Sequence, residues 1–200
     1  MTVAQMKPII TEVIEDAIKL HKLVQSDHRI IRQIESLSEA CLKSLRNGGK
    51  IIFAGNGGSF ADSQHLAAEL ISRLVFDRAP LPSIALGTNM SSTTAIGNDY
   101  GYEFIFTREM QVIGTKNDVF IPISTSGNSK NILAVVEAAN EIGMTVCGLT
   151  GETGGQLAKI CECIQIPSSR TERIQECHIL IGHILCLIIE EDYFGKQIQI

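Results

Sequence analysis

Two residues suited to acid–base or metal chemistry, His65 and Glu69, stand one helical turn apart in the stretch FAGNGGSFADSQHLAAEL, which covers residues 53–70. Side chains four residues apart share one face of a helix, so this imidazole and this carboxylate would point the same way. The spacing suits joint ligation of a metal ion, or a carboxylate assisted by an imidazole. An ordinary pair of surface side chains has the same spacing, so the pair alone leaves both interpretations open.

The glycine-rich segment GNGGS, residues 55–59, comes just before this pair. It does not have the GxGxxG spacing of a dinucleotide loop, it lacks the lysine of a phosphate-binding P-loop, and no acidic residue follows at the place that would hold a ribose. One interpretation is a tight turn from a strand into a helix. The functional alternative is that Asn56 and Ser59 form hydrogen bonds with sugar hydroxyls.

The segment STSGNS, residues 124–129, indicates a site for a small anion. It offers four hydroxyl groups, from Ser124, Thr125, Ser126 and Ser129, and Gly127 allows a tight backbone turn. Ser129 is expected to cap the helix that follows, whose free N–H groups and dipole favour a phosphate. A polar loop with an ordinary helix cap is the alternative.

A third group of polar residues lies in the late segment RIQECHILIGHIL. His178 and His183 are five apart and fall on different faces of a helix, where a histidine among apolar residues is most often a satisfied core residue. Gln175 and His183 are eight apart, which is about 12 Å along a helix axis. The two side chains would meet only by leaning toward each other, so we expect a site that combines them to draw on more than one subunit.

The elements that must position these residues alternate between strand and helix. Short apolar runs predict strands, and helical spacing of apolar residues predicts the segments between them. The strands are expected at 50–55, 83–86, 118–124, 145–150 and 163–167, and the helices at 59–75, 90–97, 101–114, 129–142, 155–160 and 171–193.

This alternation predicts one α/β domain with a parallel five-stranded sheet covered on both faces. The first fifty residues read as two helices ended by Asn47, Gly48 and Gly49, so we expect a helical arm over 1–47 and an α/β core over 48–200, within a single domain 1–200. Ligands of parallel sheets bind beyond the carboxyl ends of the strands, where GNGGS, STSGNS and TGETGG should gather.

Composition narrows the class of protein further. The 200 residues are 44% hydrophobic and carry a formal net charge of −5, which argues against nucleic acid as a partner. The N-terminus does not resemble a signal peptide, and the longest apolar run, HILIGHILCLII, is shorter than the roughly 20 residues of a membrane helix. The six cysteines contain no CxxC pair, and the close pair CEC at 161–163 is too little for a metal site. We expect free, mostly buried thiols and a cytoplasmic protein.

The motifs GNGGSFADSQHLAAEL, GNDYGYEF, STSGNS, LTGETGG and RIQECHILIGHIL resemble, in order and spacing, those of the phosphoheptose isomerases, which belong to the sugar isomerase (SIS) domain group. The resemblance covers residues 30–194. It implies a three-layer α/β/α sandwich of flavodoxin-like or Rossmann-like type, a homotetramer with active sites at subunit interfaces, and conversion of sedoheptulose 7-phosphate to D-glycero-D-manno-heptose 7-phosphate. That reaction supplies heptose for lipopolysaccharide or other surface glycans.

The resemblance also assigns residues. His65, Glu69, Gln175 and His183 match a zinc site with one ion per subunit, and Glu69 and His183 match the catalytic base and acid. The matches to substrate contacts are Asn56, Gly57, Gly58, Ser59, Glu69, Asn98, Asp99, Ser124, Thr125, Ser126, Ser129 and Gln175. In the isomerisation a proton moves between C1 and C2 through an enediol, which requires a carboxylate at the carbon and a donor at the oxygen.

A rival hypothesis is a non-catalytic SIS-domain protein that binds the replication initiator or senses sugar phosphates. Such relatives share segments like STSGNS and RIQE, so those segments do not discriminate. They typically lack the acid at the position of Glu69 and the imidazole at the position of His183. Both residues are present here, which favours the enzyme.

Overall fold

The computed structural model describes residues 3–195. Its centre is a parallel sheet of five strands in the order β2-β1-β3-β4-β5, the strand order of flavodoxin-like folds. The strands are β1 (Ile51–Gly55), β2 (Ser83–Ala85), β3 (Val119–Ile123), β4 (Thr145–Gly151) and β5 (Glu162–Ile166). Each lies within a residue or two of the predicted segment, because short runs of β-branched residues between turn residues define buried parallel strands.

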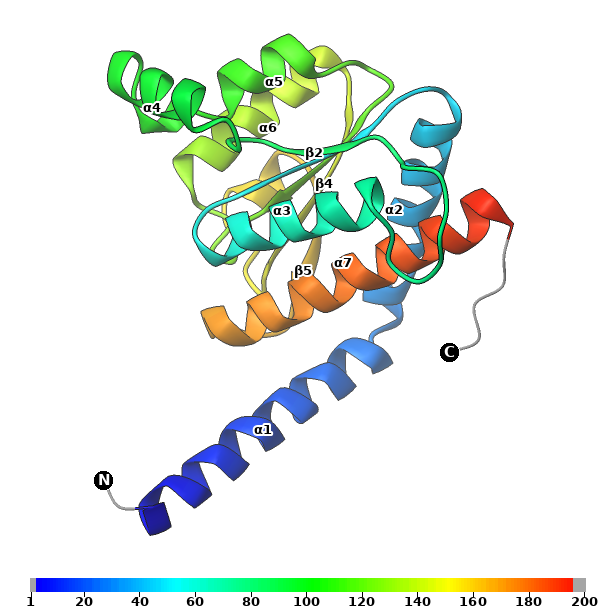
Figure 1. Cartoon of the computed structure of the whole chain (residues 1–200). Coiled ribbons are helices and arrows are strands. Elements are labelled where there is room, and N and C mark those ends of the chain that lie inside the picture. The colour runs from blue at the N-terminus through cyan, green and yellow to red at the C-terminus, as the bar shows by residue number, and fades with distance from the viewer. Residues whose placement is uncertain (1–2, 196–200) are drawn as a thin grey trace.

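Helices cover both faces of this sheet, which confirms the predicted three-layer sandwich (Figure 1). One face carries α2, α3 and α7, with α1 projecting beyond them, and the other carries α4, α5 and α6. The α-helices are α1 (Val3–Ser26), α2 (His28–Arg46), α3 (Gly58–Ile71), α4 (Met90–Asp99), α5 (Thr107–Ile113), α6 (Lys130–Ile142) and α7 (Thr171–Phe194), joined by the short 3-10 helices η1 (Tyr102–Phe104) and η2 (Leu157–Lys159).

The two layers of core follow from the alternation of side chains along each strand. In β1, Ile51 and Phe53 join the cluster beneath α2, α3 and α7, while Ile52 and Ala54 join the cluster beneath α5 and α6. All five residues of β1 are buried. The sheet is therefore a rigid platform whose strand ends hold the polar loops in place.

The N-terminal arm separates into two helices at Asp27. The Asp27 carboxylate accepts hydrogen bonds from the backbone N–H groups of Arg29 and Ile30, at 2.8 and 3.3 Å, and so caps α2. Helix α1 projects away from the α/β core (Figure 1). It leaves several large apolar side chains exposed: Met6, Ile9, Ile10, Val13, Ile14, Ile18 and Leu23.

Helix α3 ends at Ile71, four residues before the predicted end, because a buried ion pair takes over its last hydrogen bonds. Arg78 donates to the carbonyl oxygens of Glu69 and Leu70, at 2.8 and 2.7 Å, and to a Glu190 oxygen at 2.8 Å. Glu190 in turn accepts from the backbone N–H of Val75 at 2.8 Å. The side chains of Arg78 and Glu190 are 2% and 0% exposed, so this pair fastens the end of α3 to α7.

Two other predicted helices were too long. The segment 101–114 divides into η1 and α5, with Gly101 at a φ of 103° at its start, and 155–160 contains only η2. In both segments the apolar residues have helical spacing. The glycines and the short length of each segment nevertheless prevent a continuous α-helix.

Two expectations from composition can be compared directly with the structure. All six cysteines are free thiols, and Cys161 alone among them is not buried, as predicted. Within residues 3–195, no helix combines the length and the apolar character that crossing a bilayer requires.

Candidate active site

Helices α3 and α7 carry the acid–base residues and lie side by side, pointing in the same direction (Figure 1). Gly182 permits this close packing, because a Cβ atom there would overlap the side chain of Leu66. Along the pair of helices, Gln175 lies against Gly58 and Glu190 binds the chain just beyond the end of α3. The register of the two helices therefore matches residues of α3 with residues about 116 to 118 positions later.

This register brings His65, Glu69 and His183 together. The Nε2 atoms of His65 and His183 are 2.9 Å apart, and His65 Nε2 is 3.3 Å from a carboxylate oxygen of Glu69. One candidate ligand atom from each of the three lies within 4.8 Å of the others. The His65 side chain is 50% exposed and that of Glu69 is 20% exposed, so the group stands at the surface, open to a substrate.

The grouping bears on one expectation. We expected that at least one of His65, Glu69, Gln175 and His183 would come from another subunit, because of the axial offset between Gln175 and His183. The structure forms the group of His65, Glu69 and His183 within a single chain, because α3 runs parallel to α7 and offers partners along its length. Gln175 is not part of this group, so a contribution across a subunit boundary stays a prediction.

Gln175 occupies the other level, about two turns nearer the start of both helices. Its side-chain amide packs directly over Gly58 and lies beside Asp62, which is 9% exposed. Burial raises the pKa of the Asp62 carboxyl, and a hydrogen bond with Gln175 opposes that rise. One Asp62 oxygen is buried without a hydrogen-bond partner. Sequence analysis missed Asp62, although its place one turn before His65 on the same helix was a usable signal.

The donor set suits a divalent metal ion. Two imidazole nitrogens and a carboxylate oxygen are typical ligands of zinc, which holds them about 2 Å away. Ligands of one ion are therefore separated from each other by only a few ångströms, as the three donors are here. The amide of Gln175 stands near Asp62, whose buried, unpartnered oxygen shows that this polar pocket is not fully satisfied by the chain itself.

The serine-rich loop 124–129 makes a tight turn beyond β3. The backbone N–H of Gly127 donates to the carbonyl of Ser124 at 3.0 Å, and Gly127 has a φ of 64°, a conformation that favours glycine. Ser129 occupies the N-cap position just before α6, as predicted, but its hydroxyl does not bond to the helix N–H groups. It lies instead 3.2 Å from the hydroxyl of Ser124, so the two hydroxyls face each other across the loop.

The loops at the strand ends gather at one edge of the sheet, as expected. The backbone N–H of Gly151, at the end of β4, donates to the carbonyl of Thr125 at 3.0 Å, and that of Leu157 donates to the carbonyl of Gly127 at 2.9 Å. On the other side, Asn56 of the glycine turn reaches the first turn of α6. The three polar loops thus support one another.

Asn56 forms a reciprocal amide pair with Asn131. Each side chain donates to the other at 2.8 Å, and the hydroxyl of Tyr102 also donates to Asn56, at 2.9 Å. Sequence analysis predicted Asn56 but missed Asn131 and Tyr102. Asn131 is 3% exposed and stands two residues after Ser129, a position in the first helical turn that could have been noticed.

A surface cavity of about 540 Å³ joins these loops, and its lining includes Asn56, Tyr102, Ser129, Lys130 and Asn131. It therefore brings one residue of the glycine turn and one of the serine-rich loop to the same space. Lys130 adds a positive charge next to the loop. Of the predicted substrate contacts, Asn56 and Ser129 line this cavity.

The remaining predicted residues fall around these features. Gly57 and Gly58 begin α3 and are exposed, whereas Ser59 is buried. Asn98 and Asp99 stand exposed at the end of α4, where the Asn98 amide donates to Asp99 at 2.8 Å. They are not part of the group formed by His65, Glu69 and His183.

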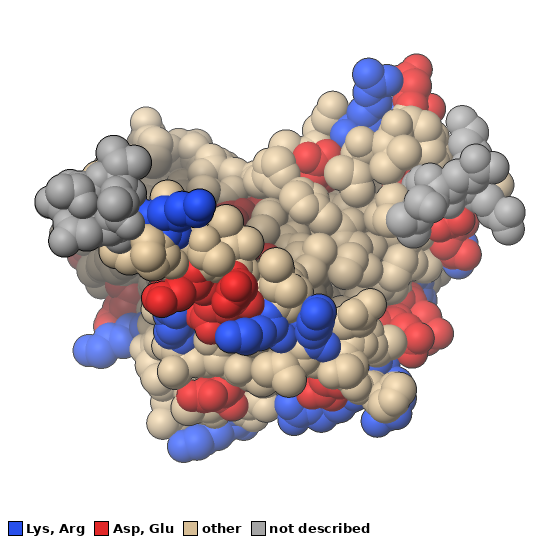
Figure 2. Space-filling model, turned by 90° about the horizontal axis from the view of Figure 1, so that it is seen from below, with Lys and Arg blue, Asp and Glu red and all other residues tan. Residues whose placement is uncertain are grey.

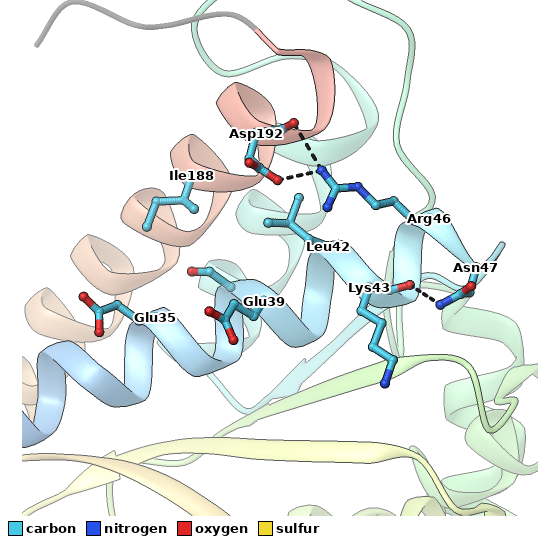
Figure 3. Close-up of a pocket in the computed structure, with 9 residues that line it drawn as sticks. Glu35, Glu39, Leu42, Lys43, Arg46, Asn47, Ile188 and Asp192 are labelled. Carbon is cyan, nitrogen blue, oxygen red and sulfur yellow. Dashed lines mark hydrogen bonds and ion pairs between the residues drawn. The ribbon is translucent and has the colours of Figure 1, made fainter.

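A second cavity, of about 560 Å³, lies between α2 and the end of α7 (Figure 3). Glu35, Glu39 and Leu42 line it together with an exposed ion pair between Arg46 and Asp192, at 2.7 Å. None of the predicted site residues lines it. Its charged groups are solvated and mostly balanced, so we assign it no chemistry.

Comparison with known proteins gives a consistent result. The family model for the SIS domain matches residues 16–151. A phosphoheptose isomerase of Aneurinibacillus thermoaerophilus is 49% identical over 193 residues, covering 96% of this chain and 98% of that protein. Phosphoheptose isomerase 2 of Campylobacter jejuni is 51% identical over 182 residues, covering 90% of each chain.

Solved structures agree with the sequence relatives. The structure of a phosphoheptose isomerase from Neisseria gonorrhoeae superposes with a TM-score of 0.87 at 37% identity, covering 93% of this chain and 99% of that one. A phosphoheptose isomerase from Francisella tularensis gives the same TM-score at 35% identity, covering 96% of this chain and all of that one.

Proposed function

The chain belongs to the phosphoheptose isomerase family of SIS-domain proteins, and we propose that it interconverts sedoheptulose 7-phosphate and D-glycero-D-manno-heptose 7-phosphate. It is an aldose–ketose isomerase. The observation that carries the catalytic assignment is the meeting of Glu69 and His183 with His65 in one chain. A non-catalytic SIS-domain binding protein is not favoured, because both residues of the acid–base pair are present and the relatives named above are isomerases.

We assign proton transfer to Glu69 and His183. Glu69 takes a proton from one of the two reacting carbons and returns it to the other, while His183 donates a hydrogen bond or a proton to the substrate oxygen, where charge develops. Glu69 sits on a helix that Arg78 and Glu190 fix at its end, so the carboxylate is held in a defined place.

The residues that would hold zinc are His65, Glu69, Gln175 and His183. A bound ion would supply polarisation of the substrate carbonyl. The spacing of the His65, Glu69 and His183 donors supports this assignment. Gln175, whose amide lies against Gly58 about two turns away, is included on the resemblance alone. One ion per subunit would account for the donor set.

We assign the phosphate to the serine-rich loop and the start of α6. The loop that carries the hydroxyls of Ser124, Thr125, Ser126 and Ser129 leads directly into the N-terminus of a 13-residue helix, whose free N–H groups favour an anion. The length of sugar selected would be set by the separation between this loop and the group of His65, Glu69 and His183.

Asn56, Gly57, Gly58, Ser59, Asn98, Asp99 and Gln175 complete the proposed set of substrate contacts. Asn56 is the best supported of them, because it lines the cavity that Ser129 also lines. The product would supply heptose for lipopolysaccharide or another heptosylated surface glycan. A cytoplasmic location stays a prediction.

We further propose that the chain acts as one domain, 1–200, that assembles into a homotetramer with its active sites near subunit interfaces. The apolar face of α1 supports assembly. Ile10, Ile14 and Ile18 are 57%, 54% and 49% exposed. Ile18 also lines, with residues of α2 and α7, an apolar cavity of about 450 Å³. Seen from below, the centre of the molecule is hollowed and nearly free of charge (Figure 2).

The assay of purified protein with sedoheptulose 7-phosphate tests the function. We expect the aldose product to form, activity to fall with a chelator, and zinc to restore it.

Glu69→Gln should lower kcat by about 100-fold or more and leave substrate binding intact, because it removes the group that accepts the proton. Glu39→Gln, in the unrelated cavity, is the matched control. Absence of product both with and without added zinc would contradict the proposed isomerase function. Near-normal turnover by the Glu69→Gln variant would exclude Glu69 as the base.

A further inference from the structure

A pair of thiols stands at the start of β5, apart from the isomerase residues. Cys161 lies in the bend before the strand and Cys163 lies within it, and their Sγ atoms are 3.8 Å apart. Cys161 is partly exposed, whereas Cys163 is 8% exposed. Both line a surface cavity of about 470 Å³, through which a small molecule can approach them.

The two thiols differ in acidity because the Cys163 thiol stabilises the thiolate of Cys161. A hydrogen bond with Cys163 lowers the pKa of Cys161, and the backbone of Gly148 adds to the effect against the opposing influence of burial. The same interaction, together with burial, raises the pKa of Cys163. Cys161 is therefore the nucleophile of the pair, since the thiolate is the reactive form of cysteine.

The other cysteines provide an internal contrast. Cys41, Cys147, Cys177 and Cys186 are all buried. Burial raises the pKa of Cys147 and of Cys186 to about 12, and that of Cys177 to about 11. Buried thiols of this kind are inert toward reagents dissolved in water.

We propose that Cys161 and Cys163 form a redox-active dithiol that hydrogen peroxide oxidises to a disulfide, which thiol reductants reverse. The site is independent of the proposed isomerase function. The proposal rests on the separation of the sulfur atoms, the unequal exposure of the two thiols and the cavity that opens onto them.

The chemistry proceeds in two balanced steps. The Cys161 thiolate attacks one oxygen of the peroxide, the O–O bond breaks, and Cys161 becomes a sulfenic acid while hydroxide leaves and takes up a proton to become water. The Cys163 sulfur then attacks the Cys161 sulfur, the S–O bond breaks, and a second water molecule leaves with the proton of Cys163. Two thiols are oxidised by two electrons and one peroxide is reduced to two molecules of water.

The geometry makes the second step accessible. Disulfide formation requires the sulfurs to approach from 3.8 Å to about 2.05 Å, a movement that two side chains share. Cys161 is in a bend and not in a regular strand, so it can contribute most of the adjustment. A neighbouring thiol that closes the disulfide also protects Cys161 from irreversible oxidation to a sulfinic acid.

Mass spectrometry of the full-length protein tests the proposal. After hydrogen peroxide treatment we expect loss of two hydrogen atoms, located by peptide mapping to one peptide that contains both Cys161 and Cys163 and reversed by dithiothreitol. Cys163→Ser should accumulate a sulfenic acid at Cys161 that dimedone labels. Cys161→Ser should leave Cys163 unlabelled, because its thiol is buried and poorly acidic. Cys177→Ala is the matched control and should behave like the parent.

Isomerase activity before oxidation verifies that each variant is folded, and mapping of the parent protein needs no variant. The proposal is overturned if the parent keeps both thiols reduced after peroxide treatment. It is equally overturned if dimedone labels Cys161 in the parent and no disulfide to Cys163 forms, or if oxidation gives only disulfides between chains. It is also overturned if Cys161→Ser is labelled at Cys163 as readily as Cys163→Ser is labelled at Cys161.

Discussion

Thr125 provides the sharpest residue-level test of phosphate binding. It lies in the turn between β3 and α6, and its carbonyl is held by the backbone of Gly151. Thr125→Val removes one hydroxyl and keeps the shape of the side chain. Loss of a hydrogen bond to a charged group costs about 1.5–3 kcal/mol, so KM for the sugar phosphate should rise roughly 10-fold or more with little change in stability.

Thr145→Val serves as the control, because Thr145 is exposed at the opposite end of β4. Steady-state kinetics of the two variants give the comparison. An unchanged KM in Thr125→Val, together with a phosphate ion that binds at another place in a crystal, would refute the assignment of this loop.

His178 connects a single residue to the dependence of stability on pH. It is fully buried on α7, its Nε2 atom is 3.2 Å from the carbonyl of Thr150, and burial lowers its pKa to about 4. Between this value and the unfolded value of about 6.5, the unfolded chain binds a proton that the folded chain does not. The free energy of unfolding should therefore fall as the pH falls through this window, by about 2 kcal/mol from pH 7 to pH 5.

Urea unfolding at both pH values and one protein concentration measures this effect. His178→Gln should lose most of it, whereas His28→Gln, at an exposed site on α2, should retain it. The same pH dependence in His178→Gln and the parent would show that other groups are responsible.

At the scale of elements, the parallel packing of α3 and α7 changes the expected outcome of a mixing experiment. Glu69 and His183 belong to one chain's own pair of helices. Each chain in a mixture of Glu69→Gln and His183→Gln subunits lacks one of the two groups, so activity should not return after subunit exchange. Native mass spectrometry confirms exchange, and activity measurements give the result. Recovery of activity would show that neighbouring chains complete each other's sites.

The elements also show what sequence patterns can and cannot reveal. Strand positions and the order of helices were predictable, because apolar periodicity reports directly on burial. The end of α3 was not, because it depends on Arg78 and Glu190, which are distant in sequence and meet only in the folded chain. The same limit explains why the sequence did not predict that His183 meets His65 and Glu69 within one chain, since those two residues lie on a helix more than a hundred residues earlier. It also explains the omission of Asn131 and Tyr102.

For the whole molecule, the exposed apolar face of α1 makes assembly testable. Ile10→Glu combined with Ile14→Glu places two charges on that face, where their burial in a subunit contact would be costly. We expect light scattering to show a smaller assembly than the parent forms. Lys19→Glu, a charge change elsewhere on the same helix, should not alter the assembly. A tetramer that persists in the double variant would mean that α1 is not part of the contact.

The buried pair of Arg78 and Glu190 has a consequence for how the sequence can diverge. Replacing either residue alone strands the other charge in the interior, which typically costs about 3–5 kcal/mol, a large share of the stability of an ordinary domain. Replacing both with apolar residues need not be harmful. If the two residues are replaced one after the other in evolution, the protein with a single replacement is unstable. Only nearly simultaneous substitution of both residues avoids this unstable intermediate. We therefore expect the two positions to be inherited as a unit, retained or lost together.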